Sequence, residues 1–393
     1  MSSARLLYLV TEDWYFVLHR LPMARAARDA GFEVHVAARV AKHGEAIAAE
    51  GFQLHPLDWR RASMNPVEFL RSIQAVRSLY RAVRPDLVHH VALQPGIVGS
   101  IAALGLPIAV LNATAGVGFA FTSNTLKARI ARPLLAFMMR ALFNRRRSMV
   151  VVENPDDGAA LAALGVAAER IVRIPGSGVD VERFMPLPEP DGPITVAYAG
   201  RLLEDKGLRA LIDAQARLAE TAHPIRLLLA GEPDPANPTS ISASTLDEWR
   251  RRPGVELLGH VADVRTVWAA AHIAVLPSRR EGLPLSLVEA AACGRPLVAT
   301  DVPGCREIAR ADVDAMLVPV DDPPALADAI RQLADDPQRR ARYGAAGRRL
   351  AETEFSSARV GHEIVALYHR LLGQPNPATP SDRNTGPSEA PTA

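Results

Sequence analysis

The chain has 393 residues, enough for two domains of ordinary size, and its 48% hydrophobic and 22% charged content is typical of a globular protein. Its two cysteines, Cys293 and Cys305, are too few for a disulfide framework. Both stand in small, apolar contexts, so we interpret them as packing residues in a reducing cytoplasm. No apolar run reaches the length of a membrane span, and the short apolar stretch near Met1 has the wrong flanks for a signal peptide.

Charge is distributed unevenly along the chain. Residues 1–150 hold 19 Lys and Arg against 9 Asp and Glu, whereas the remainder holds 26 against 34. A basic first half attracts phosphates, anionic lipid or nucleic acid. No recognised nucleic-acid-binding module occurs in the sequence, so we expect no nucleic-acid partner.

In the first part of the chain, short apolar segments alternate with amphipathic segments of helical length. The predicted strands are Arg5–Val10, Glu33–Ala38, Gln53–Leu57, Asp86–His90, Pro107–Asn112, Met149–Val152 and Arg170–Ile174. Strands separated by helix-length segments predict parallel βαβ units. We therefore expect residues 1–185 to form a doubly wound, Rossmann-like α/β domain.

A proline-rich segment, residues 186–193, predicts a linker, after which the same rhythm begins again. The second series of predicted strands is Ile194–Ala199, Ile225–Ala230, Val255–Leu258, His272–Pro277, Pro296–Thr300 and Ala315–Val318. Residues 194–355 are thus a second Rossmann-like domain, residues 356–372 a final helix that crosses back to the first domain, and residues 373–393 a disordered tail. Two such domains facing across a cleft would bind ligands beyond the carboxyl ends of their strands.

A basic loop follows the first strand of the second domain. Gly200 permits a tight turn there, and Arg201 and Lys206 come at the start of the next helix. Two cations beside a helix N-terminus can bind a diphosphate and stabilise it as a leaving group. The alternative is an ordinary basic helix start at the surface.

A pair of carboxylates separated by seven residues, Glu281 and Glu289, is the most informative motif of the chain. Glu281 follows a predicted strand, and Glu289 lies about two turns into the helix that Pro284 opens. Free N–H groups between them can bind an anion, and the carboxylates can accept bonds from sugar hydroxyls. The alternative is a capped surface helix with two solvated glutamates.

These motifs, with others between them, resemble those of retaining glycosyltransferases of family four, which have the GT-B fold. The matching segments are Gly200-Arg201 with Lys206-Gly207, Ala230-Gly231-Glu232, Leu258-Gly259-His260, Glu281 with Glu289, and Thr300-Asp301 with Pro303-Gly304. The resemblance extends over residues 4–372, and the first domain is similar to the subgroup that builds capsular polysaccharide, exopolysaccharide and lipid-linked glycans.

The resemblance implies a role for each matching residue. Arg201 and Lys206 would bind the diphosphate of a nucleotide-sugar, Glu281 the transferred sugar, and Glu289 the ribose. Gly200, Gly282, Leu285 and Ser286 would line the same donor site, and Glu281, Arg201 and Lys206 would act in catalysis. Such enzymes use no cofactor and in the usual case no metal. Asp312 and Asp314 have the spacing of a metal motif, but we interpret them as a solvated turn past the donor site.

Candidates on the acceptor side come from the first domain. His19 and Arg20 follow the first strand, and His90 ends a later strand whose neighbour ends in Asn112. Gly116 and Gly118 after Asn112 would let the backbone approach a ligand closely. A structural role for the histidines is an equal alternative.

Residues from Asn124 to Arg147 combine seven basic side chains and no acidic one with apolar residues at helical spacing, including Leu134 and Leu142. This pattern is typical of an amphipathic helix at an anionic membrane surface. A crossover helix with solvated arginines is the alternative. We favour the membrane, because a polyprenyl-diphosphate-linked acceptor requires it.

We therefore expect a metal-independent retaining glycosyltransferase that transfers a hexose or N-acetylhexosamine from a nucleotide-sugar, a UDP-sugar in our expectation. The acceptor would be a lipid-linked glycan at the cytoplasmic face of the cell membrane. A sugar-nucleotide epimerase of the same fold would need acid–base carboxylates in the first domain, where Glu12 and Asp13 are the candidates. A non-catalytic nucleotide-sugar-binding protein is a further alternative.

Overall fold

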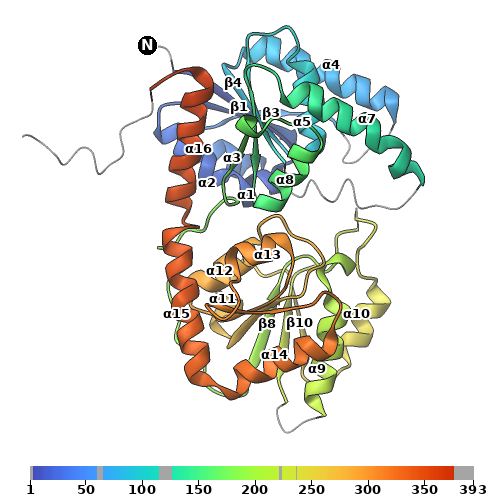
Figure 1. Ribbon diagram of the computed structural model, residues 1–393, viewed down its shortest axis with the longest axis vertical. Coiled ribbons are helices and arrows are strands. Elements are labelled where there is room, and N and C mark those ends of the chain that lie inside the picture. The colour runs from blue at the N-terminus through green and yellow to red at the C-terminus, as the bar shows by residue number, and fades with distance from the viewer. Residues whose placement is uncertain (1–2, 60–64, 115–125, 221–223, 236, 376–393) are drawn as a thin grey trace, which may run out of the picture. The chain divides into compact units, whose positions relative to one another are not determined.

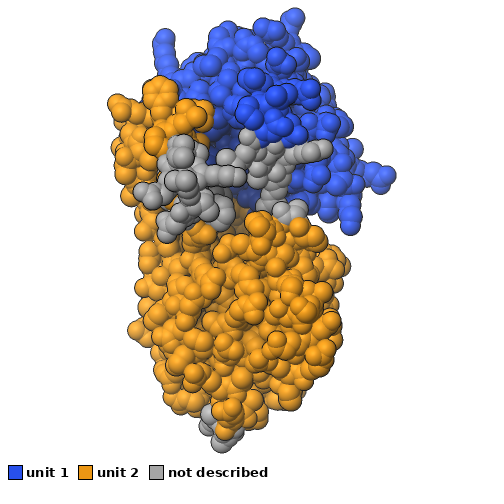
Figure 2. Space-filling view, turned by 90° about the vertical axis from the view of Figure 1, so that its right-hand side faces the viewer, with its two compact units in different colours: residues 1–113, 141–150, 361–393 blue, residues 114–140, 151–360 orange. Residues whose placement is uncertain are grey.

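The computed structural model describes residues 3–59, 65–114, 126–220, 224–235 and 237–375, without the side chains of residues 126–131. The chain forms two compact units (Figure 2). The first unit comprises residues 1–113, 141–150 and 361–393, and the second comprises residues 114–140 and 151–360. Residues 376–393 of the expected disordered tail lie outside the described residues. The domain limits expected from the sequence remain predictions.

The first sheet has seven strands in the order β3-β2-β1-β4-β5-β6-β7. Its strands are β1 (Arg5–Glu12), β2 (Glu33–Arg39), β3 (Gln53–Pro56), β4 (Leu87–Val91), β5 (Ala109–Ala113), β6 (Ser148–Val152) and β7 (Ile171–Arg173). The helices of this part are α1 (Asp13–His19), α2 (Leu21–Asp29), α3 (Gly44–Ala49), α4 (Pro66–Val83), α5 (Leu93–Ala102), α7 (Leu126–Phe143) and α8 (Pro155–Ala163). Strands β1 to β5 pair in parallel.

The second sheet has six parallel strands in the order β10-β9-β8-β11-β12-β13. They are β8 (Thr195–Ala199), β9 (Arg226–Ala230), β10 (Val255–Gly259), β11 (Ile273–Leu276), β12 (Leu297–Thr300) and β13 (Ala315–Val318). The helices are α9 (Leu208–Ala219), α10 (Ala243–Arg250), α11 (Arg265–Ala269), α12 (Leu285–Ala292), α13 (Pro303–Ile308), α14 (Pro323–Asp335) and α15 (Pro337–Thr353). The last helix, α16 (Ser357–Leu372), belongs to the first unit from Gly361 onward. Figure 1 shows helices flanking the strands of each sheet.

These elements confirm the predicted α/β class with two doubly wound parallel sheets. Every predicted strand is present, with ends within two residues of the expected limits. The strands read as continuous apolar runs because helices cover both faces of a parallel sheet, and β8 is buried from Thr195 to Ala199. Cys293 and Cys305 are free and fully buried, as expected for packing residues.

Strand order reverses at one place in each sheet. In the first sheet the reversal lies between β1 and β4, and in the second between β8 and β11. Chains leaving two such strands turn to opposite faces, which opens a crevice at the carboxyl ends where ligands bind in doubly wound folds. The structure therefore predicts the position of a site in the second sheet from topology alone.

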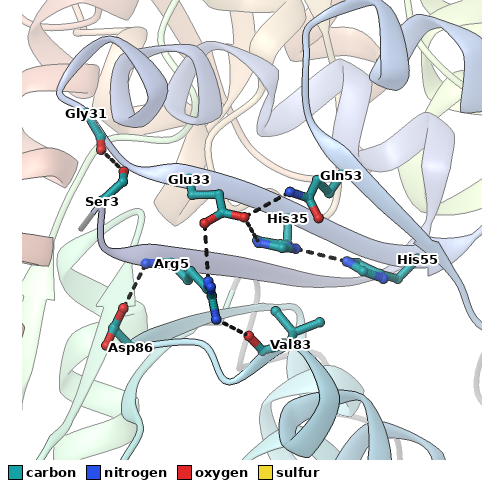
Figure 3. A network of polar contacts seen from close by, with 9 residues as sticks. All are labelled: Ser3, Arg5, Gly31, Glu33, His35, Gln53, His55, Val83 and Asp86. Atoms are coloured by element: carbon teal, nitrogen blue, oxygen red, sulfur yellow. Dashed lines mark hydrogen bonds and ion pairs between the residues drawn. The ribbon is translucent and has the colours of Figure 1, made fainter.

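A polar network occupies the opposite, amino-terminal edge of the first sheet (Figure 3). His35 and His55 on neighbouring strands share a hydrogen bond of 3.0 Å, and the other ring nitrogen of His35 lies 3.2 Å from Glu33. Arg5 contacts Glu33 at 3.2 Å. Because the carboxylate of Glu33 can only accept, the His35 nitrogen that faces it carries a proton. The network joins three strand ends and is distant in the sheet from the crevice edge.

A second polar network lies inside the first unit. His90 Nδ1 is 2.8 Å from Asn112 Oδ1, and His90 Nε2 is 2.8 Å from the hydroxyl of Tyr80. All three side chains are almost completely buried. Gly99 makes room for the ring, since a Cβ there would come within 2.3 Å of His90 Nε2. The amide oxygen only accepts, so His90 is the neutral Nδ1–H tautomer, and burial lowers its pKa to about 4.

The buried His90 makes the stability of the fold depend on pH. Between about pH 6.5, the pKa of an unfolded histidine, and pH 4, the unfolded chain binds a proton that the folded chain does not. The free energy of unfolding should therefore decrease as pH falls through this window, by up to ~1.4 kcal/mol per pH unit. The variant His90→Gln should lose this part of the dependence in denaturant titrations between pH 4 and 8. An unchanged slope in the variant would contradict the assignment, whatever its absolute stability.

Candidate functional site

The site in the second sheet is built on β8 and β11, the two strands at the reversal of strand order. The loop after β8 contains Arg201 and Lys206, and the loop after β11 contains Glu281. Gly207 brings the two loops together, because a Cβ on it would lie 1.9 Å from the carbonyl oxygen of Pro277. Its φ of +69° is also one that glycine adopts without strain. Only glycine at this position allows the start of α9 to touch the end of β11.

Lys206 and Glu281 meet where the two loops touch. The Lys206 ammonium lies 2.5 Å from Glu281 Oε1, and the Ser278 hydroxyl donates to the same oxygen over 2.6 Å. Both charged side chains are largely buried, with exposures of 21% and 11%. Two donors thus hold one carboxylate oxygen of Glu281, and the carboxylate keeps the ammonium in the crevice. Ser278 was not among the predicted site residues.

Arg201 is held from two sides. Its guanidinium lies 2.8 Å from Asp234 after β9, and the buried hydroxyl of Tyr198 donates to its backbone carbonyl over 2.7 Å. Burial raises the pKa of Tyr198 well above its usual range, so this hydroxyl remains a donor. Gly231 packs directly against the backbone of Gly200, the residue before Arg201. A Cβ on Gly231 would lie only 1.9 Å from the carbonyl oxygen of Gly200. Asp234 lay outside the residues singled out from the sequence.

Glu289 lies on α12 and is partly buried. Burial raises the pKa of its carboxyl to about 8, an effect that the charge of Arg183 opposes and that of Asp263 reinforces. Among the described residues, no side chain or backbone group donates a hydrogen bond to this carboxylate. Carboxyl groups whose pKa is raised by partial burial are concentrated at functional sites.

The first turn of α12 lies between the two glutamates. Leu285 and Ser286 are its first two helical residues and follow Pro284 at the N-cap, one position earlier than expected for the proline. Backbone N–H groups at these positions have no partner within a helix. Together with the dipole of the helix they favour an anion. Gly282 continues the same loop and packs on Gly304, whose Cβ would lie 2.3 Å from the Gly282 carbonyl oxygen.

The second unit therefore brings together the loops that carry the predicted donor-side residues. These residues are Gly200, Arg201, Lys206, Glu281, Gly282, Leu285, Ser286 and Glu289. Arg183, Asp234, Asp263 and Ser278 complete the surroundings and were not predicted. Ser278 lies three residues before Glu281 in the same loop, so proximity in the sequence offered a clue for it, and none for the others. The roles assigned to these residues remain predictions.

The predicted acceptor-side residues are not gathered into one exposed site. His90 and Asn112 belong to the buried network described above, and Arg20 is only 3% exposed. His19 is partly exposed, and its ring lies 4.4 Å from that of Tyr15. Gly116 and Gly118 lie outside the described residues. An acceptor role for the described four is still a prediction, and the contacts of His90 and Asn112 favour the structural alternative.

The two carboxylates required by the epimerase alternative are engaged in structural contacts. Glu12 pairs with Arg39 at 2.8 Å. Asp13 Oδ2 accepts three backbone N–H groups, from Ala41, Lys42 and His43, at 2.8 to 2.9 Å. Burial opposes ionisation of Asp13, but these hydrogen bonds prevail and lower the pKa of its carboxyl. A carboxylate held in this way is a poor proton donor.

The basic segment forms α7, whose side chains are described for residues 132–143. This part of the helix is amphipathic, but its apolar residues are not buried on the expected face. Leu134 and Phe137 are 61% and 68% exposed, whereas Met139, Leu142 and Phe143 are buried. Leu142 was expected on the same face as Leu134, so this expectation was wrong. Pro133 interrupts the helical hydrogen bonding and precedes the exposed pair. Two large apolar side chains thus face solvent on a helix rich in arginine.

The predicted solvated turn at Asp312 and Asp314 is half correct. Asp312 is 86% exposed in its side chain, but Asp314 is completely buried. The backbone N–H of Arg310 donates to Asp314 over 2.7 Å, and burial raises the pKa of Asp314 to about 6. Within the described part of the chain, no three His, Cys, Asp or Glu side chains are placed to hold a metal ion. No described helix is long and apolar enough to cross a membrane.

Comparison with protein families identifies both parts of the chain. Residues 5–152 match the family described as glycosyl transferase 4-like, and residues 193–336 match glycosyl transferases group 1. The second match begins at the end of the predicted linker and contains Arg201, Lys206, Glu281 and Glu289.

Relatives of similar length cover nearly the whole chain. EpsD of Bacillus subtilis is 27% identical over 94% of this chain and 97% of its own. The capsular polysaccharide biosynthesis glycosyltransferase CapM of Staphylococcus aureus is 23% identical, over 95% and 98%. The N,N'-diacetylbacillosaminyl-diphospho-undecaprenol alpha-1,3-N-acetylgalactosaminyltransferase of Campylobacter jejuni is also 23% identical, over 90% and 95%.

Solved structures share the fold over almost the full chain. Sucrose-phosphate synthase from Thermosynechococcus elongatus matches with a TM-score of 0.79 at 21% identity, over 94% of this chain and 99% of its own. Anabaena Alr3699/HepE in complex with UDP matches with a TM-score of 0.76 at 19% identity, over 93% and 100%. These likenesses confirm the expected GT-B architecture.

Glu289 provides a test of the site that needs no ligand. Its folded pKa of about 8 exceeds the unfolded value, so the free energy of unfolding falls as pH rises from about 4.3 to 8. The variant Glu289→Gln removes the charge and should melt a few degrees higher than the parent at pH 8, a gain on the order of 1 kcal/mol. The gain should disappear at pH 5.

Glu256→Gln is the matched control, because Glu256 is exposed and paired with Arg226 at the amino edge of the same sheet. It should give no pH-dependent gain. Equal melting temperatures of Glu289→Gln and the parent at pH 8 would show that ionisation of Glu289 does not destabilise the fold, which would contradict the raised pKa of its carboxyl.

Proposed function

The chain belongs to the glycosyltransferases of group 1 with a 4-like first domain, and from this premise we propose that it uses a UDP-sugar as donor and a lipid-linked glycan as acceptor. The sugar transferred is a hexose or an N-acetylhexosamine, and its anomeric configuration is retained.

The observation that supports a nucleotide-sugar donor is the convergence of Arg201, Lys206 and the first turn of α12 at the reversal of strand order. Two cations and two free N–H groups match the two negative phosphates of a nucleoside diphosphate. The same groups stabilise the diphosphate as it leaves. This preorganised charge is our reason for proposing transfer without a metal ion.

Glu281 and Glu289 match the two sugar moieties of such a donor. The carboxyl group of Glu289 can exchange hydrogen bonds with the vicinal hydroxyls of a ribose, because it accepts in either protonation state. One oxygen of Glu281 is occupied by Lys206 and Ser278, which orients the carboxylate and directs its remaining acceptor capacity to the transferred sugar. Lys206 pairs with Glu281 and Arg201 with Asp234, and each cation has further N–H donors that can contact a phosphate while these pairs are kept.

Relatives support the choice of UDP and of the acceptor. HepE was solved with UDP and with UDP-glucose, and its fold is shared over nearly the full chain. The name of the Campylobacter jejuni relative specifies a diphospho-undecaprenol acceptor. We propose the same acceptor class here, a glycan linked to a polyprenyl diphosphate.

An acceptor of this kind places the enzyme at the cytoplasmic face of the membrane. We propose that α7 contacts the lipid surface through Leu134 and Phe137, which are exposed beside arginines. Apolar side chains would enter the interface while the basic residues attract anionic headgroups.

The donor proposal predicts nucleotide-dependent stabilisation. A bound ligand raises the melting temperature by mass action, so UDP should stabilise the protein more than GDP or ADP at equal concentration. Arg201→Ala should lose most of this effect, because one charge-assisted contact to phosphate typically contributes ~1.5–3 kcal/mol. Arg226→Ala is the matched control, since this exposed arginine lies at the amino end of β9 and pairs only with Glu256 among the described residues.

A melting temperature that no nucleotide changes would contradict the donor site. Conversion of a UDP-sugar to its epimer, without transfer to acceptor, would identify the epimerase instead.

The membrane proposal predicts binding to anionic vesicles. In sedimentation with phosphatidylglycerol vesicles, the double variant Leu134→Ser, Phe137→Ser should bind about tenfold or more weakly than the parent, because it loses most of two exposed apolar side chains. Leu70→Ser is the matched control, since Leu70 is 60% exposed on α4. Equal loss in both variants would show that general surface hydrophobicity, and not α7, determines binding.

A further inference from the structure

The loop that carries Glu281 is held from one side by the segment after β6. We call residues 278–284 the Glu281 loop. Glu153 and Asn154 directly follow β6 and contact the backbone of this loop, about 130 positions away in the sequence. Neither residue belongs to a motif identified from the sequence.

Asn154 uses both ends of its amide group. Its Oδ1 accepts from the Asp157 N–H over 2.8 Å and so caps the N-terminus of α8. Its Nδ2 donates to the carbonyl oxygen of Gly282 over 2.9 Å and to Asp157 Oδ2 over 3.1 Å. The side chain is almost completely buried. Asn154 therefore ties the Glu281 loop to a rigid helix terminus.

Glu153 holds the other end of the same peptide group, the one that joins Gly282 to Leu283. Its Oε2 accepts from the backbone N–H of Leu283 over 3.1 Å. The side chain of Leu283 is fixed in turn by Gly176, where a Cβ would lie 2.7 Å from Leu283 Cδ2. On another side, Gly304 packs so closely against the Gly282 carbonyl oxygen that no Cβ would fit between them. The peptide group between Gly282 and Leu283 is thus restrained by two side chains and by close packing.

These restraints act on groups assigned to the transferred sugar. Gly282 is the neighbour of Glu281, so restraint of the Gly282–Leu283 peptide limits the movement of the backbone that carries the Glu281 side chain. Leu283 lies two residues before Leu285, the first residue of α12. The contacts of Arg201 are made by Asp234 and Tyr198, which belong to other segments.

We propose that Glu153 and Asn154 are positioning residues for the transferred sugar of the donor, acting through the Glu281 loop and without touching the substrate. This inference rests on the proposed donor function. Displacement of a catalytic group by about 1 Å can reduce turnover by roughly a hundredfold, so loss of these hydrogen bonds should reduce kcat while leaving the nucleotide part of the site intact.

Matched variants separate this role from folding. Asn154→Ser keeps a good helix cap for α8 but is too short to donate to Gly282. Glu153→Ala removes the acceptor for Leu283, whereas Glu153→Gln keeps an amide oxygen of the same reach. Melting temperatures without ligand establish that each variant is folded, and Glu153→Gln serves as the conservative control.

The measurements are the Kd for UDP and the kcat and KM for hydrolysis of UDP-glucose and UDP-N-acetylglucosamine, using whichever the parent hydrolyses faster. Asn154→Ser and Glu153→Ala should bind UDP within about twofold of the parent and lose about 10- to 100-fold in kcat. Glu153→Gln should keep kcat within about threefold.

Unchanged kcat in Asn154→Ser and Glu153→Ala would overturn the inference. An equal loss of UDP affinity would also overturn it, because it would indicate a general structural role. A parent protein that fails to bind UDP would instead refute the donor proposal itself, so the two failures are distinguishable.

Discussion

The contact between Gly207 and the end of β11 is the constraint on which the site depends. Without a side chain at this position, the start of α9 approaches the carbonyl oxygen of Pro277, and Lys206 reaches Glu281 across the junction. Any other residue would force the two loops apart by more than an ångström, since a Cβ would overlap the oxygen. The reversal of strand order supplies the crevice, and this close approach places a cation and a carboxylate in it.

The charges of the site are balanced in two different ways. Arg201 and Lys206 each have a carboxylate partner, so the positive charge of both side chains is compensated within the protein. Glu289 has no hydrogen-bond donor among the described residues, and burial raises the pKa of its carboxyl instead. The two cations are thus neutralised by ion pairs, whereas the carboxyl of Glu289 is protonated more readily than an exposed one.

Buried polar groups elsewhere show why residue type alone does not identify a site. His90 and Asn112 have chemistry suited to an acceptor site, yet they satisfy each other, together with Tyr80, in the core of the first unit. Asp314 is similarly buried near β13. In contrast, Leu134 and Phe137 are apolar but exposed, although large apolar side chains are usually buried. Their exposure makes α7 a candidate interaction surface.

The sequence by itself determined the α/β class, every strand and the residues of the donor-side motifs, because hydrophobic periodicity and glycine-containing turns are local properties. It also led to the correct family, since the order and spacing of several motifs are preserved along the chain. The tertiary structure decided the rest. It paired Arg201 with Asp234, buried His90 and Asp314, turned Phe137 outward, and joined Asn154 to Gly282 across 128 positions. Such contacts depend on how segments that are distant in the sequence pack together. The local sequence pattern of each segment does not show which other segment it will contact.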